Sequence, residues 1–105
     1  MSDRDIDQAL VERAQKGEHK AFELLVVKYQ RRLNRLISRF IKDEHEVHDV
    51  TQEALIKAYR ALPNFRGESA FYTWLYRIAI NTAKNFLITS GKRVMLQSDV
   101  ANDEG

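Results

Sequence analysis

The sequence contains no cysteine, a single proline and only four glycines in 105 residues. The absence of cysteine excludes a disulfide framework and a thiolate metal site, and it is typical of proteins from a reducing compartment. Proline and glycine interrupt regular helices most strongly, so their scarcity favours long helices. No stretch alternates between apolar and polar residues as a half-buried strand would, and we therefore expect an all-α fold.

Long apolar runs are also missing from the sequence. The first residues, MSDRDIDQ, are charged and lack the apolar segment of a secretion signal. No run of about 18 apolar residues, the length that a membrane-spanning helix needs, occurs. We expect a soluble, cytoplasmic chain with one domain and no direct membrane insertion.

Charge is segregated along the chain, although the formal net charge is only +2. Residues 28–42 contain six Lys or Arg and no acid, whereas residues 43–53 contain five acids and no Lys or Arg. Between residues 54 and 94, seven basic residues stand against Glu68 alone. Such blocks indicate one face for a polyanion and another for a basic partner, although solvated helix faces would explain any single block equally well.

Apolar residues recur at helical spacing in the first half of the chain. The first expected helix spans about residues 5–16 and stops at Gly17. The second is long, about residues 20–41, because its apolar stripe continues for over five turns. The inward residues are expected to be Ile6, Leu10, Val11 and Ala14 in the first helix, and Phe22, Leu25, Val26, Tyr29, Leu33, Leu36, Ile37 and Phe40 in the second.

Two more helices are expected in the second half. The third spans about residues 44–62 and cannot continue through Pro63. An ordered loop precedes the fourth helix, which Ser69 could cap. Beyond Leu87 the helical period is lost, and we expect a domain over residues 1–90 followed by a linker or flexible tail over 91–105. The inward residues of the third helix are expected to be Val47, Val50, Thr51, Ala54, Ala58 and Leu62.

The fourth helix separates an apolar stripe from a polar face on a wheel of about 100° per residue. The polar face has two cations and three uncharged hydrogen-bonding groups but no carboxylate, a combination that suits phosphates and base edges. Ile80 interrupts this face. The pattern favours nucleic-acid binding. The apolar stripe consists of Phe71, Leu75, Ile78, Ala79, Thr82 and Phe86, and the polar face of Thr73, Arg77, Asn81, Lys84 and Asn85.

Five aromatic residues fall between positions 65 and 76. The wheel assigns Phe71 to the core and Trp74 to its flank, where we expect Trp74 to pack on the protein and not to stack on DNA. Phe65, in the loop, is the ring that we most readily place near a bound base; the alternative is that it braces the loop from inside. The same pattern leaves Tyr72 and Tyr76 undecided.

The outward face of the third helix has the opposite charge. Asp49, Gln52 and Glu53 lie there with Arg60, and they surround one large apolar side chain, Ile56. A single exposed isoleucine is normal on a protein surface. An apolar anchor ringed by acids is also typical of a surface that docks on a basic partner helix. The residues alone leave both interpretations open.

The sequence contains no complete enzyme or metal-binding motif. "HEVHD" at 45–49 resembles a zinc-protease motif, but the second histidine would have to stand where Asp49 is. His45 and His48 have no obvious third ligand. There is no phosphate-binding P-loop, dinucleotide-binding glycine pattern or nucleophile elbow. We therefore expect a binding module without cofactor or metal, not an enzyme.

The segment "DVTQEALIKAYRALPNFRGESAFYTWLYRIAINTAKNFL", with "LVERAQKGEHKAFELLVVKYQ" before it, resembles the first conserved domain, region 2, of extracytoplasmic-function sigma factors of the envelope-stress type. The resemblance extends over about residues 8–90 and is continuous over four helices. It implies a compact four-helix domain that attaches to core RNA polymerase. It also implies recognition of the minus-ten promoter element as melted, non-template single strand.

The resemblance assigns roles to individual residues. The "DVTQEALIKAYRAL" helix would dock on the clamp helices of the polymerase β′ subunit, and the loop "NFRGESAF" would capture a flipped base. Polymerase contacts are expected at Asp49, Gln52, Glu53 and Ile56. Base-pocket residues are expected to be Asn64, Phe65, Arg66, Gly67, Glu68, Ser69 and Ala70, with Arg77, Asn81, Lys84 and Asn85 on bases and phosphates, and Lys57 and Arg60 at the approach.

The sequence departs from the family pattern in two ways. Leu55 stands where the family often has phenylalanine, which we expect to change packing more than contact. No second helix-turn-helix domain follows the linker, so we expect a fragment of a longer factor, without recognition of the minus-thirty-five element. A membrane-anchored anti-sigma factor is implied as a partner by similarity only.

The sequence leaves two alternative functions, both of them less favoured. A duplex-reading helix-turn-helix regulator is disfavoured because residues 63–69 are longer than the usual three- or four-residue turn. A protein-docking adaptor without nucleic-acid contact is disfavoured by the acid-free fourth helix.

Overall fold

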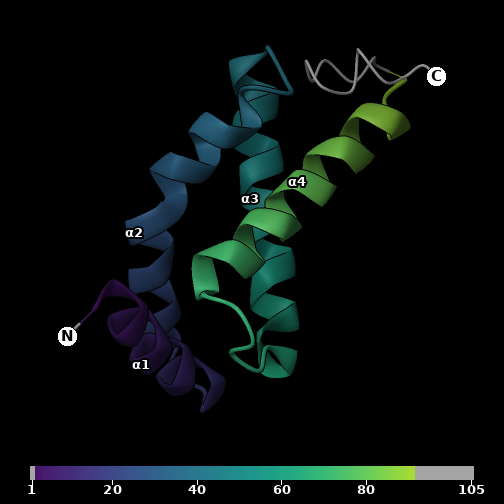
Figure 1. Ribbon diagram of the computed structural model, residues 1–105. Coiled ribbons are helices and arrows are strands. Elements are labelled where there is room, and N and C mark those ends of the chain that lie inside the picture. Colours follow the sequence, from purple (N-terminus) through teal and green to yellow (C-terminus); the bar gives the residue numbers. More distant parts are fainter. Residues whose placement is uncertain (1, 92–105) are drawn as a thin grey trace.

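The computed structural model describes residues 2–91, which form four α-helices and one short 3-10 helix and contain no strand. The helices are α1 (Asp3–Gln15), α2 (His19–Ile37), α3 (Glu44–Ala61) and α4 (Phe71–Thr89), with η1 (Leu62–Asn64) after α3. In Figure 1, α4 crosses α3 and α1 lies across the lower part of α2; both pairs are in contact. The all-α prediction is confirmed.

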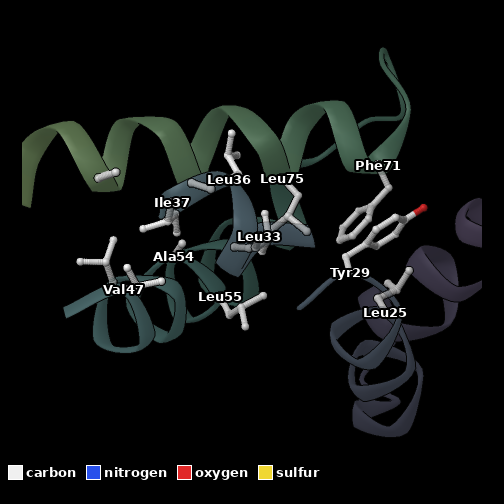
Figure 2. Close-up of a cluster of buried hydrophobic side chains, with 14 of the residues drawn as sticks. Leu25, Tyr29, Leu33, Leu36, Ile37, Val47, Ala54, Leu55, Phe71 and Leu75 are labelled. Atoms are coloured by element: carbon white, nitrogen blue, oxygen red, sulfur yellow. The ribbon is translucent and has the colours of Figure 1, made fainter. Parts of the chain in front are cut away.

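The core fills the space between α2, α3 and α4. Figure 2 shows side chains from these three helices meeting there, including Leu33 from α2, Ala54 from α3 and Leu75 from α4, all of which are buried. Replacing such a leucine with alanine usually costs about 2–5 kcal/mol of stability. Leu55 is also buried here.

The inward residues predicted for α3 are all buried, and most of those predicted for α2 and α4 are buried as well. In α4 the stripe is shifted slightly. Ile78 and Phe86 are only partly buried, and Ala83 and Leu87 are buried beside Phe71, Leu75, Ala79 and Thr82. The 3.6-residue period therefore located the core faces of the long helices.

The prediction that Ile6 faces inward is wrong. Ile6 is 42% exposed, and its neighbour Asp7 is buried at 4% exposure. Asp7 accepts hydrogen bonds from the Tyr29 hydroxyl and from Lys28 Nζ, the latter at 2.7 Å. Pairing and hydrogen bonding of this kind offset the cost of burying a carboxylate. The pairing with α2 thus overrides the apolar period at the start of α1.

Capping groups determine where α1 and α3 begin. α1 begins earlier than predicted because Ser2 forms a capping box with Asp5. α3 begins as predicted, since Asp43 accepts hydrogen bonds from the first-turn N–H groups of His45 and Glu46. Gly17 follows α1 with φ of 100°, which confirms it as a stop.

The other boundaries shift by a few residues. α2 ends at Ile37, four residues before the predicted end, because the N–H groups of Arg39 and Phe40 donate to carbonyls three residues back. Phe40 and Ile41 stay buried through this turn. α4 continues to Thr89, beyond the predicted end. Ser69 does not cap α4: Ala70 occupies the cap position, and the Ser69 hydroxyl donates to the Ala70 carbonyl. The predicted tail 91–105 lies outside the described residues except for Gly91.

Candidate nucleic-acid interface

The loop between α3 and α4 is held in place by α1. The side-chain amide of Gln15 donates to the carbonyls of Leu62, at 2.9 Å, and Phe65, at 2.8 Å. Gly67 adopts φ of 77°, a conformation that disfavours other residues, and the Gln8 side chain lies 3.5 Å from the position that a Cβ would take. Sequence analysis missed Gln15, because nothing in its local pattern marks a partner about fifty positions away.

Phe65 braces the loop from inside. Its side chain is only 8% exposed, and its ring lies 4.8 Å from the Trp74 ring and 6.1 Å from the Phe71 ring, measured between centroids. Trp74 is half-buried and also packs on Phe71. The structure favours internal packing of Phe65 over the preferred prediction that its ring lies near a bound base. The rings therefore form the base on which the loop rests.

A pocket of about 220 Å³ opens between this loop and the start of α4. Phe65 and Trp74 supply apolar walls, Arg66 and Arg77 supply positive charge against the single carboxylate of Glu68, and Asn64 and Ser69 are uncharged and polar. A planar ring edged with hydrogen-bonding groups fits such a combination of surfaces. The pocket is lined by Asn64, Phe65, Arg66, Glu68, Ser69, Trp74 and Arg77, and five of these belong to the predicted base-pocket residues.

The N-terminus of α4 adds a favourable potential for anions. Ala70 at the cap offers no side-chain acceptor, and the first turn has no acid. The first N–H groups of a helix carry partial positive charge, which attracts phosphate oxygens. The helix thus begins beside the loop pocket with this charge uncompensated by a carboxylate of its own first turn.

The polar face predicted for α4 is at the surface. Thr73, Arg77, Asn81 and Asn85 are exposed, and Lys84 is half-buried. Ile80 is half-buried as well, so it interrupts the face less than the wheel suggests. Arg77 belongs to this face and also lines the loop pocket, and it joins the two parts of the candidate interface.

Lys57 and Arg60 lie exposed on α3. Lys57 Nζ is 3.3 Å from a carboxylate oxygen of Glu53, one turn earlier on the same helix. Glu53 is a predicted polymerase contact, so the pair joins the two predicted surfaces. Ion pairs this exposed are weak, and Lys57 stays available to a phosphate.

The outward face of α3 has the predicted form. Asp49 and Glu53 are exposed, Gln52 is half-buried, and Ile56 is 51% exposed between them. A large apolar side chain surrounded by charge is the arrangement expected of a docking surface. No residue of this face lines the loop pocket, so the domain has room for two partners on different parts of its surface.

The part of the chain that the structure describes has neither a metal-binding cluster nor a membrane-spanning helix. Within residues 2–91, no three His, Cys, Asp or Glu side chains lie close enough together to hold a metal ion. In the same residues, none of the helices has the length and apolar character that crossing a membrane requires.

Comparison with known proteins agrees with this geometry. The model of the Sigma-70 region 2 family matches residues 25–93, more than half of the chain. Over 93 residues, or 89% of this chain, the sequence is 63% identical to the RNA polymerase sigma-H factor of Pseudomonas aeruginosa and 62% identical to the ECF RNA polymerase sigma-E factor of Escherichia coli K12. The aligned part is 48% of each relative, so the chain spans about half the length of these proteins.

A solved structure is similar over almost the whole chain. It is the NMR structure of the complex formed by an engineered region 2 of sigmaE with GTAAAA. The TM-score is 0.78 at 56% sequence identity, and the match covers 91% of this chain and 100% of that one. Sequence, fold and candidate interface lead to one conclusion: the chain belongs to the sigma-70 region 2 family and is homologous to the sigma-E factors.

Proposed function

We propose that this chain is the domain of a transcription initiation factor of the envelope-stress type. It binds core RNA polymerase and recognises the minus-ten promoter element as melted, non-template single strand. The observation that carries the proposal is the loop pocket, which adjoins the acid-free face of α4 in a chain 56% identical to a region 2 solved with GTAAAA. Residues 1–90 constitute this domain, and its role is binding, not catalysis.

The loop pocket receives one base turned out of the strand. Turning out a base costs a few kcal/mol of lost stacking and pairing, and the cost is least when the strand is already single. Stacking on an aromatic side chain contributes roughly 1–3 kcal/mol per base and offsets that cost. The exposed part of Trp74 and the loop backbone of Arg66–Ala70 enclose the base, and the buried ring of Phe65 supports them.

The rest of the strand lies along α4. Asn81 and Asn85 carry amides that can read base edges, and Arg77 and Lys84 neutralise phosphates. Lys57 and Arg60 on α3 attract the strand as it approaches. Because much of the affinity comes from phosphate neutralisation, binding weakens steeply as salt rises.

The outward face of α3 docks on the clamp helices of the β′ subunit. Ile56 is the apolar anchor, and Asp49, Gln52 and Glu53 meet basic or polar groups of the partner. The exposure of Ile56 and the acidic charge around it support this assignment. By family resemblance, a membrane-anchored anti-sigma factor covers the polymerase-binding surfaces and holds the factor inactive in the cytoplasm.

A duplex-reading regulator is the alternative, and one observation weighs against it. The connection between α3 and α4 runs through η1 and a loop with a pocket of its own. A helix-turn-helix unit instead joins its helices by a turn of three or four residues. A pocket of this kind has no use in reading stacked base pairs.

An abasic scan of the GTAAAA strand tests the base pocket. Each base is removed in turn while the sugar and phosphate remain, and binding to the chain is measured by fluorescence anisotropy. One position should lose roughly fivefold to over a hundredfold in affinity, as expected for loss of a stacked base. Equal, small losses at all six positions would contradict capture of a single base.

A further inference from the structure

A second pocket, of about 300 Å³, lies between α2 and α4. Its lining combines three arginines with two tyrosines and one leucine, and among the described residues that line it there is no carboxylate. It shares no lining residue with the loop pocket. The lining residues are Arg32, Arg35, Leu36, Arg39, Tyr72 and Tyr76.

One of these arginines is held in position by aromatic stacking. The guanidinium carbon of Arg32 lies 4.2 Å from the centroid of the Tyr72 ring. Tyr72 stacks in turn on Tyr29, at 4.9 Å and an interplanar angle of 28°, and the Tyr29 hydroxyl is bound to the buried Asp7. A guanidinium stacked on a ring keeps its N–H groups free at the edge. Arg32 is thus oriented before any ligand arrives.

The two other arginines and Tyr76 complete a site for a nucleotide. Arg35 and Arg39 are exposed, and Tyr76 is 40% exposed. Guanidinium groups bind phosphate oxygens through paired N–H donors, and a tyrosine face stacks on any base. An acidic peptide would satisfy the charges but would leave the rings without a planar partner.

The pocket adjoins the path of the strand along α4. Tyr76 lines it, and the next residue, Arg77, lines the loop pocket. Consecutive residues of a helix project about 100° apart, so the two pockets flank the same turn of α4. A strand with one base in the loop pocket reaches the second pocket by crossing the helix over this turn.

The geometry points to a second nucleotide subsite, in which Arg32, Arg35 and Arg39 hold the phosphates of a nucleotide next to the captured base and Tyr76 stacks on its ring. The inference rests on the proposed function, because its ligand is the same single strand. It extends the interface to α2, which the assignment of roles to the loop and α4 did not include.

The test compares two variants of equal charge in the full chain. Arg35→Ala/Arg39→Ala removes two pocket arginines, and Arg4→Ala/Arg31→Ala removes two exposed arginines that do not line the pocket. Three single strands are used: GTAAAA, the same strand with three thymidines added at its 5′ end, and the same strand with three thymidines added at its 3′ end. Their binding is measured by fluorescence anisotropy between 50 and 200 mM salt. Circular dichroism melting confirms that both variants fold.

The pocket variant should bind at least one of the three strands more weakly than the control variant does. The variant loses two phosphate contacts, and each contact with a single strand contributes about 0.7 to the slope of log affinity against log salt. Its slope should therefore be shallower than that of the wild-type chain by about 1.4. Tyr76→Leu should lose about fivefold or more in affinity, and Tyr76→Phe should retain it. Equal binding of all strands by pocket and control variants would overturn the subsite.

Two further outcomes are distinguished by the same experiment. If the wild-type chain binds none of the strands, the proposed function itself fails and the subsite with it. If a hexaglutamate peptide displaces the strand in a manner that depends on Arg35 and Arg39, and Tyr76→Leu binds DNA normally, the pocket serves an acidic protein segment and the inference is overturned.

Discussion

The ring of Phe65 lies against the ring of Trp74, with 4.8 Å between their centroids and 38° between their planes. Phe65 directly follows η1, and Trp74 lies in the first turn of α4. Both residues line the loop pocket. The shape of the pocket thus depends on a core contact, and Phe65 links the stability of the fold to the proposed capture of a base.

Phe65→Ala should lower the free energy of unfolding by about 3 kcal/mol, the lower end of the range for truncating a buried phenylalanine, since the side chain lies at the edge of the core. Urea denaturation measures the loss, and Arg66→Ala, on the exposed neighbouring side chain, serves as the control. The Phe65 variant should also lose the position-specific penalty in the abasic scan. If Phe65→Ala were as stable as the wild-type protein, the ring would not brace the loop.

Asn81 and Lys84 should affect DNA binding in different ways. Asn81→Ala should weaken the preferred sequence more than a scrambled strand, by about 1–3 kcal/mol, because an amide reads a base edge. Lys84→Ala should weaken all sequences alike and make the salt slope shallower, because it removes a phosphate contact. Competition titrations with both strands measure the two effects. Uniform losses in both variants would refute this division of roles.

Ile56→Asp should abolish capture of core RNA polymerase without unfolding the domain. The side chain is 51% exposed, so the fold loses little, whereas an apolar anchor becomes a charge at the centre of the docking face. Val27→Asp is the matched control, since Val27 is 76% exposed on α2, away from that face. A pull-down with core enzyme measures the effect, and unchanged capture by Ile56→Asp would remove α3 as the docking helix.

Stability should fall as the pH rises from about 10 to 12. Burial, together with the hydrogen bond to Asp7, raises the pKa of Tyr29 from 10.0 to about 12, so the folded state retains the phenolic proton longer than the unfolded chain. The contribution of Tyr29 to stability is complete below its pKa in the unfolded chain, and it is lost as the pH rises through its pKa in the folded state. Hydrogen bonds to Asp3 and Asp7 raise the pKa of Lys28 in the same direction.

Tyr29→Phe tests this network. The variant should be less stable at neutral pH by about 1–3 kcal/mol, because the buried Asp7 carboxylate loses a donor. Its stability should also depend less on pH between 10 and 12. Urea denaturation at pH 8 and pH 11 measures both effects, and an identical pH dependence in wild type and variant would exclude Tyr29 as the titrating group.

The sequence predicted those parts of the fold that depend on periodicity. The core faces of α2, α3 and α4 and the exposed faces around Ile56 and Asn81 follow from a 3.6-residue repeat, which each helix carries by itself. The misplaced side chains at the start of α1 depend on partners distant in sequence. Asp7 is buried because α2 supplies Tyr29 and Lys28, and no local pattern signals that pairing.

The candidate site was also predictable only where its residues are continuous in sequence. The loop and the polar face of α4 are continuous in sequence, so composition and resemblance located them. Gln15, which anchors the loop, and Arg32, which stacks on Tyr72, come from α1 and α2. Their side chains reach the site only through tertiary packing, and Arg32 was visible in the sequence merely as one charge of a basic block.

Binding of a longer strand that contains GTAAAA, as single strand and as a stable duplex, measured with the same chain at the same salt, tests the central claim most directly. The account predicts tighter binding to the single strand, because the loop pocket takes a base that a duplex keeps stacked and paired. Equal or tighter binding to the duplex would contradict it.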